Sequence, residues 1–99
     1  EVIERIDGIE AVNGHSYLGS FNRKAFAFGL KNNMAMTGGS DAHMPEEIGN
    51  AFTLIEGKTA EDLRKAIKQK KTFACGRIVP LYHHAFTQLA RMNLIKDGD

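Results

Sequence analysis

Apolar residues in this chain gather in short runs that end at turn-forming residues. The first run contains Ile9 and Val12 and stops at Asn13-Gly14, a strong turn signal. Further runs of similar length follow, each bounded by Gly, Asn or Lys. Short runs between turn residues are typical of strands, so the pattern predicts strands at 6–14, 34–37, 50–55 and 72–75.

Two stretches between these runs have the spacing of apolar residues that is typical of helices. Asn22 is a candidate N-cap for a helix that continues through Leu30. Thr59 opens the clearer helix, and Asp62 stands where a capping box places its acidic partner. Three aromatic residues in or near the first helix are expected in the core: Phe21, Phe26 and Phe28.

A last helix is predicted after Pro80, which is well suited to the first turn. About one turn separates each of Leu81, Ala85, Leu89 and Met92 from the next, so we expect an apolar side that packs over an open face. The tail 96–99 is expected to be frayed.

The predicted order is strand, helix, strand, strand, helix, strand, helix. This alternation indicates the α/β class, with short and mostly parallel strands. In such folds functional sites lie at the carboxyl ends of strands. The segments 13–15 and 41–43 both fall at such ends, so we expect them to form a site.

The second of these segments carries the strongest candidate chemistry. In extended backbone, Asp41 and His43 would point to the same side and offer an oxygen and a nitrogen to one metal ion. That mixture suits Zn, Mn or Fe. Ser40 is open to two interpretations, a nucleophile or a hydroxyl that stabilises the loop, and we favour the loop.

Composition adds limits on size, charge and compartment. The 99 residues are 42% hydrophobic and 25% charged, which fits one small domain or part of a larger one. Lys and Arg number 13 against 12 Asp and Glu, so a broadly basic nucleic-acid surface is not indicated. The basic run 68–71 is interpreted as a helix end, with phosphate or nucleic-acid contact as the alternative.

Cysteine content and hydropathy indicate the compartment. Cys75 is the only cysteine, so no internal disulfide can form, and a reducing, cytoplasmic location fits best. No apolar run approaches the ~20 residues that span a membrane.

Several sequence pieces occur in an order that resembles a known family. They are 9–14, Asn22 with Ala25, the segment Gly38-Gly39-Ser40-Asp41-Ala42-His43, Glu47 with 49–53, 61–67 and 73–76. Together they look like the C-terminal third of a PHP (polymerase and histidinol phosphatase) domain with its associated C-terminal segment. The resemblance covers about 8–77 and leaves a helix and tail at 78–99. We therefore expect 1–99 to be a single partial domain.

The resemblance implies a fold and an activity. PHP domains are distorted (β/α)7 barrels, and members are metal-dependent phosphoesterases or parts of bacterial replicative polymerases. Their sites bind Mn, Zn or Fe through several motifs, of which the last matches Asp41 and His43. By resemblance these two are metal ligands, and Asn13, His15 and Ser40 are candidates for the pocket. The substrate would be a phosphate ester, either a small molecule or a nucleotide.

The chain departs from the family pattern by lacking its other ligand motifs. The His-x-His motif and the middle His and Glu motifs are absent. Two-metal hydrolysis needs more ligands than the two identified here. We therefore expect the divalent metal to belong to the full-length protein, with weak or no binding and little or no hydrolysis by this chain alone. The alternative is a catalytically silent α/β module that serves assembly or binding.

Other polar residues carry weaker expectations. Glu46 and Glu47 are read as an exposed acidic loop, with support of His43 as the alternative. His83 and His84 are expected at the surface of the last helix. A slice of a barrel leaves sheet edges open, so we expect self-association or pairing with a missing N-terminal part of the domain.

Overall fold

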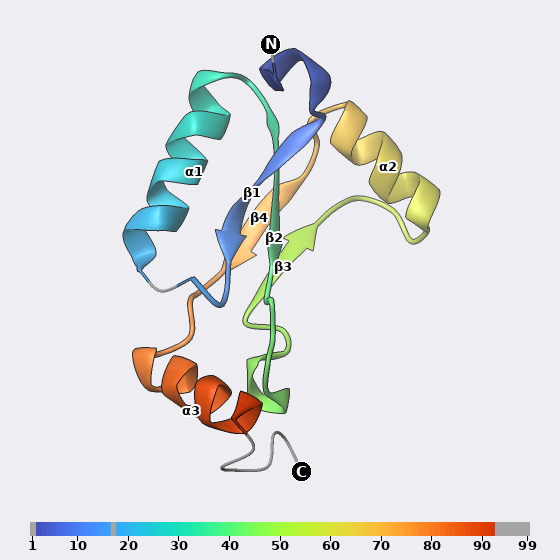
Figure 1. Ribbon diagram of the computed structural model, residues 1–99. Coiled ribbons are helices and arrows are strands. Elements are labelled where there is room, and N and C mark those ends of the chain that lie inside the picture. Colours follow the sequence, from blue (N-terminus) through green and yellow to red (C-terminus); the bar gives the residue numbers. More distant parts are fainter. Residues whose placement is uncertain (1, 17, 93–99) are drawn as a thin grey trace.

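The computed structural model describes residues 2–16 and 18–92, and its elements follow the predicted order (Figure 1). The structure also contains two short 3-10 helices, η1 and η2, in addition to the predicted strands and helices. The elements are η1 Val2–Arg5, β1 Gly8–Asn13, α1 Gly19–Lys31, β2 Ala35–Gly39, η2 Pro45–Glu47, β3 Ala51–Leu54, α2 Ala60–Lys68, β4 Phe73–Gly76 and α3 Leu81–Arg91. The chain is therefore α/β with short elements, as predicted.

The first sheet is a parallel pair connected by a helix. Strand β1 pairs with β2, and a bulge between Glu10 and Val12 leaves Ala11 fully buried. Helix α1 crosses from one strand to the other and packs on β1. Gly29 makes this close packing possible, because a Cβ there would lie 2.7 Å from the sulfur of Met36.

The second sheet, β3 with β4, is antiparallel, so the expectation of mostly parallel pairing holds only for the first sheet. Strand β3 follows β2 through a loop and the single turn η2, without a crossover helix. β2 and β3 do not pair with each other, and β3 reaches its antiparallel partner β4 through helix α2. Figure 1 shows β3 running opposite to β1 and β4.

Side-chain hydroxyls connect β2 to the second sheet. Thr53 Oγ1 accepts from the Gly38 amide at 2.9 Å and donates to the Gly38 carbonyl at 2.8 Å. Thr72 donates to the Met36 carbonyl at 2.6 Å. At Gly38 a Cβ would lie 2.5 Å from the Phe52 carbonyl oxygen, so only glycine allows this approach. These contacts fix the strand end from which the candidate site begins.

Helix α2 begins with the capping box that the sequence predicts. Thr59 Oγ1 accepts from the Asp62 amide, and the Asp62 carboxylate accepts from the Thr59 amide. Hydrogen bonds from the Lys58 amide, the Thr59 amide and the Thr59 hydroxyl hold the pKa of Asp62 below its ordinary value of 3.8. The predicted start of this helix is therefore confirmed to the residue.

The core is small and made largely of alanine. Among the described residues, the buried hydrophobic ones are Ala11, Ala35, Ala51, Ala66 and Val79. The expectation that the three phenylalanines lie in the core is wrong, because each is at least 39% exposed. Helix α1 packs on its sheet at Gly29, and three bulky aromatic residues of the helix are left exposed: Phe21, Phe26 and Phe28.

Helix α3 lies beyond the carboxyl ends of β1 and β4 and faces the candidate site (Figure 1). It begins after Pro80, as predicted; of its expected apolar side, Ala85 is exposed and the Leu81 side chain lies outside the described ones. His84 and Thr87 are buried, whereas Leu89 and Met92 are exposed. The predicted frayed tail, 96–99, lies outside the described residues. In the described part of the chain, no helix has the length and apolarity to cross a membrane.

Candidate metal centre

The turn after β1 brings His15 to the carboxyl end of the first sheet. The Gly14 amide donates to the Gly39 carbonyl at 2.9 Å, and Gly14 in turn accepts from the Val79 amide. The Asn13 side chain accepts from the His15 amide at 2.8 Å. The end of β1, the end of β2 and the segment before α3 are thereby held together around the position of His15.

Asn22 supports the same turn and does not cap α1. That helix begins at Gly19, with Leu18 as its N-cap and no side-chain cap hydrogen bond, which corrects the prediction for Asn22. The Asn22 amide group donates to the Asn13 carbonyl at 3.1 Å and accepts from the Asn13 amide at 3.1 Å. This paired contact anchors the end of β1 on helix α1.

The Asp41 to His43 segment is a turn, where the sequence suggested extended backbone. Asp41 has a φ of 49°, in the left-handed region. The His43 Nδ1 lies 2.8 Å from the Asp41 carbonyl oxygen. A carbonyl only accepts, so Nδ1 carries the hydrogen and Nε2 keeps a lone pair for a metal. The Asp41 carboxylate is exposed and accepts from the Asn13 side chain at 3.4 Å.

Glu47 is fully buried, which corrects the expectation of an exposed acidic loop. Its Oε1 accepts from the His43 amide at 2.8 Å, and its Oε2 lies 2.7 Å from His83 Nδ1 on α3. Burial alone would raise the pKa of Glu47, but these hydrogen bonds and the nearby imidazoles outweigh it and lower the pKa. The carboxylate is therefore ionised at neutral pH inside the protein.

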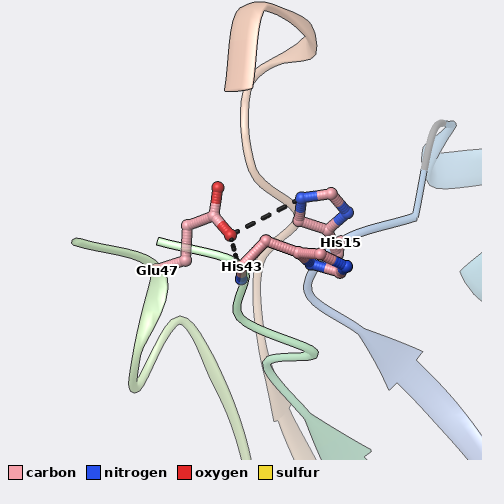
Figure 2. A group of neighbouring side chains, drawn as sticks. All are labelled: His15, His43 and Glu47. Atoms are coloured by element: carbon pink, nitrogen blue, oxygen red, sulfur yellow. Dashed lines mark hydrogen bonds and ion pairs between the residues drawn. The ribbon is translucent and has the colours of Figure 1, made fainter. Parts of the chain in front are cut away.

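His15 stands beside this carboxylate without a hydrogen bond from its inner nitrogen (Figure 2). Its side chain is 8% exposed, and its Nε2 lies 3.5 Å from Glu47 Oε1. Among the described residues, this Nε2 is the buried side-chain nitrogen or oxygen that has no hydrogen-bond partner. Burial, and then the neighbouring His43, lower the pKa of His15, so its ring is neutral and can act as a ligand.

The three side chains form a group with donor atoms of metal-binding type. One ligand atom from each of His15, His43 and Glu47 lies within 4.8 Å of the others. Two imidazoles and one carboxylate are a donor set that catalytic zinc sites use. The unpartnered Nε2 of His15 indicates that these side chains can accommodate a metal ion, because a cation would give this atom the partner that it lacks.

The surrounding pocket shows where the other expected residues lie. It has a volume of about 200 Å³, and Asp41, His43 and His15 line it from the strand ends. Asn13 connects Glu10 to Asp41 through its side-chain amide, and Ser40 is half-buried. Asn13 and Ser40 are not among the residues that line this pocket.

Helix α3 forms the other wall of the pocket, which the sequence reasoning missed. His84, Thr87, Gln88 and Arg91 line it from this side. The expectation of surface histidines is therefore wrong: His84 is buried, and the His83 side chain is 14% exposed. Glu47 had been named only as the alternative support of His43, and the His43 amide does donate to it; its position four residues after His43, on a turn begun by Pro45, was the usable signal.

Comparison with known proteins places these observations in a family. A family model described as PHP-associated matches residues 19–72, so His43 and Glu47 lie inside the match, whereas His15 and α3 lie outside it. An uncharacterized protein of Methanocaldococcus jannaschii, MJ1588, is 54% identical over 35 residues, which cover 35% of this chain and 31% of that protein. No solved structure matches the chain. Because the family model covers more than half of the residues, the chain belongs to the PHP-associated family.

Proposed function

We propose that this chain is the C-terminal portion of a metal-dependent phosphoesterase of the PHP type. Membership of the PHP-associated family supports this proposal. The observation that carries it is the pocket at the ends of β1 and β2, where Asp41, His43 and His15 present carboxylate and imidazole groups side by side. Such groups beside one open pocket suit the binding of a metal ion and a phosphate oxygen.

The arrangement of elements supports a barrel origin. The β1–α1–β2 unit is a parallel pair with a crossover helix, the repeating unit of (β/α) barrels. We propose that this unit belongs to a distorted PHP-type barrel whose other strands lie outside this chain. The position of the pocket at the carboxyl ends of the parallel strands agrees with the usual place of barrel active sites.

Three residues of the pocket have a proposed role, Asp41, His43 and Arg91. By resemblance Asp41 and His43 bind a divalent metal, Mn, Zn or Fe, which would lower the pKa of a bound water and polarise the phosphoryl group. The pocket of about 200 Å³ has room for a phosphoryl group and part of its ester, either a small molecule or one end of a nucleotide. The guanidinium of Arg91 at the pocket wall suits contact with phosphate oxygens.

One observation favours the alternative, a catalytically silent α/β module. Both oxygens of Glu47 already have hydrogen-bond donors within the chain, from the His43 amide and from His83. The Glu47 carboxylate can therefore hold α3 in place without taking part in any reaction. In this alternative the pocket is a remnant of a catalytic site, and the chain serves assembly or binding.

The experiment that separates the two measures hydrolysis of p-nitrophenyl phosphate with Mn²⁺, Zn²⁺ or Fe²⁺. The chain alone and the protein encoded by the complete gene are compared, each with Asp41→Ala and with Glu46→Ala, an exposed neighbour, as the matched control. We expect turnover by the whole protein, loss of it on chelation, and a drop of at least 100-fold in Asp41→Ala only. No turnover with any of the three metals would support the silent module.

A further inference from the structure

Helix α3 covers the pocket and does not rest on an apolar face. It lies at the carboxyl end of β1, apart from α1 and α2 (Figure 1), and it does not pack extensively on any helix or strand of the described chain. Of the α3 side chains that the structure describes, the buried ones are polar, His84 and Thr87, whereas Leu89 is exposed. Burial of apolar residues normally fixes a surface helix, so polar contacts have a larger part in holding α3.

A charged hydrogen bond is the strongest of these polar contacts. His83 Nδ1 lies 2.7 Å from Oε2 of Glu47, whose carboxylate is fully buried. The His84 ring also contacts His15, with ring centres 4.2 Å apart, and its Nε2 lies 3.4 Å from the Ser16 carbonyl oxygen. A short bond to an ionised carboxylate is about twice as strong as a neutral hydrogen bond. The bond between His83 and Glu47 therefore contributes most to the position of α3.

The chain is anchored up to the residue before α3 and is exposed immediately after it. The Val79 amide donates to the Gly14 carbonyl at 2.6 Å, and the Val79 side chain is 1% exposed. Pro80 follows at the surface, and α3 begins at the next residue. The ring fixes φ of Pro80 but leaves its ψ free to rotate. A change of this one dihedral angle moves α3 and leaves the anchored segment in place, as at a hinge.

Movement of α3 away from the site would leave few polar groups without partners. The Thr87 hydroxyl donates to the His83 carbonyl within its own helix at 3.0 Å, so this bond does not depend on the site. Glu47 would exchange an imidazole for water, and water would reach His15 Nε2, which is buried without a hydrogen-bond partner when α3 is in place. The cost of opening is thus chiefly one charged hydrogen bond, which changes an equilibrium about 10- to 100-fold.

We propose that α3 is a gate of the pocket, which turns about Pro80 and is held closed by the hydrogen bond between His83 and Glu47. In the closed position α3 contributes Thr87 and Arg91 to the wall of a pocket of about 200 Å³. In the open position this wall is absent, and ligands enter or leave. The identity of those ligands rests on the proposed function, whereas the opening is a property of the chain and is tested without metal or substrate.

Native-state hydrogen exchange tests whether α3 opens by itself. A detached helix of 11 residues is marginal in water, so its amides exchange once it leaves the site. Exchange of the purified chain is followed by mass spectrometry at several urea concentrations below the unfolding transition. We expect the α3 amides to exchange about tenfold faster than those of β1 or more, with little dependence on urea, because local opening exposes little surface. Exchange in β1 should depend steeply on urea.

The substitution His83→Gln tests the bond that holds the gate closed. It should speed exchange in α3 about 10- to 100-fold and leave exchange in β1 within about threefold. Ala85→Gln places the same residue at an exposed position of the same helix, outside the pocket, and serves as the matched control. The control should change exchange in α3 by less than about threefold. Circular dichroism checks that both variants are folded.

Chemical modification of His15 reports opening at the pocket itself. Diethyl pyrocarbonate reacts with accessible neutral imidazoles, and the His15 side chain is 8% exposed. The rate of its modification, mapped by mass spectrometry, should be at least about 100-fold lower than in the urea-unfolded chain. His83→Gln should raise this rate at least about tenfold, and Ala85→Gln should leave it unchanged.

Three results would overturn the gate. The first is exchange in α3 and β1 with the same rate and the same urea dependence in the unaltered chain, because α3 would then open only when the whole fold opens. The second is equal acceleration of both elements by His83→Gln, because the bond would then stabilise the fold as a whole. The third is a rate of His15 modification that His83→Gln does not change.

The same measurements separate the gate from the proposed function. Independent opening of α3, with no hydrolysis of p-nitrophenyl phosphate by the whole protein, would uphold the gate and contradict the proposed function. Hydrolysis by the whole protein, with α3 exchanging only through global unfolding, would remove the gate and leave the proposed function standing.

Discussion

Glu47 is an ionised carboxylate held entirely inside the protein. Its charge is stabilised by the His43 amide and the His83 ring, which compensate for the loss of water. Hydrogen bonds to a charged group contribute more than neutral ones, about 1.5–3 kcal/mol each. A single side chain thus connects the loop after β2, the turn after β1 and helix α3.

Replacement of Glu47 by alanine should therefore destabilise the chain strongly. We expect the free energy of unfolding to fall by about 3 kcal/mol or more, measured as the midpoint of urea unfolding. Glu46→Ala, at the exposed neighbouring position, should change it by less than about 0.5 kcal/mol. Equal effects of the two substitutions would show that the buried carboxylate adds nothing to stability.

The Asp62 carboxylate should make the stability of the folded chain depend on pH. Three hydrogen bonds lower its pKa in the folded chain below the ordinary 3.8, so the unfolded chain binds the proton more readily. The carboxylate therefore stabilises the fold fully above that value, and the stabilisation is lost as the pH falls through 3.8 to the lower folded pKa. We expect the stability difference between the chain and Asp62→Asn to be constant above pH 5 and to shrink below 3.8.

Urea midpoints measured at several pH values check this expectation. Glu56→Gln, an exposed carboxylate outside the capping box, provides the comparison. A difference between the chain and Asp62→Asn that stays unchanged down to pH 3 would mean that the capping box does not depend on the charge of Asp62.

At the scale of elements, local signals in the sequence were sufficient for the order of the elements and for the start of α2. Thr59 and Asp62 predict the start of α2 because a cap depends on residues only three apart. The end of β2 was not predictable in this way, because the strand continues through Gly38 and Gly39 beyond the predicted end at 37. Strand direction was not, because the loop between β2 and β3 reverses the chain through tertiary contacts such as that of Thr53 with Gly38.

The candidate site was predictable only in part. The segment that ends in His43 was identified from its residue types and its place after a strand. Glu47 was named only as the alternative support of His43, and His83 only as a surface residue. Their burial depends on a contact between residues 36 positions apart, which no local pattern contains.

Helix α3 is expected to become more rigid when metal binds. If an ion fixes His43, the Glu47 carboxylate that accepts from the His43 amide holds the His83 ring more firmly, and α3 opens less often. Hydrogen exchange of the amides in α3 should slow at least fivefold on addition of Zn²⁺, whereas exchange in α2 should not change. His83→Gln should abolish the slowing. Equal slowing in both helices would indicate general stabilisation, without a specific connection through Glu47.

The molecule as a whole is more extended than a compact domain of its length. Its radius of gyration is 15.3 Å, whereas a compact chain of about 100 residues has about 13 Å. The described residues form two sheets of two strands each, and several large apolar side chains lie at the surface. Leu54 and Phe73, paired neighbours on β3 and β4, are 56% and 65% exposed.

Such a surface argues that the purified chain associates with itself. Open strand edges and contiguous apolar side chains are usually covered by another chain, and a second copy is the partner always present in a pure sample. We expect light scattering after size exclusion to show a dimer or larger species at micromolar concentration. Phe73→Lys should shift the species toward monomer, because a charge at this exposed position opposes burial of the β3–β4 surface.

The control for this prediction changes charge elsewhere. Glu61→Lys alters an exposed residue of α2 by two charge units and lies outside the β3–β4 pair, so it should leave the mass unchanged. A stable monomer over a hundredfold range of concentration would contradict self-association. In that case the apolar surface would be one that a different chain covers, and the N-terminal part of a PHP domain, supplied as a separate polypeptide, would be the partner to test next.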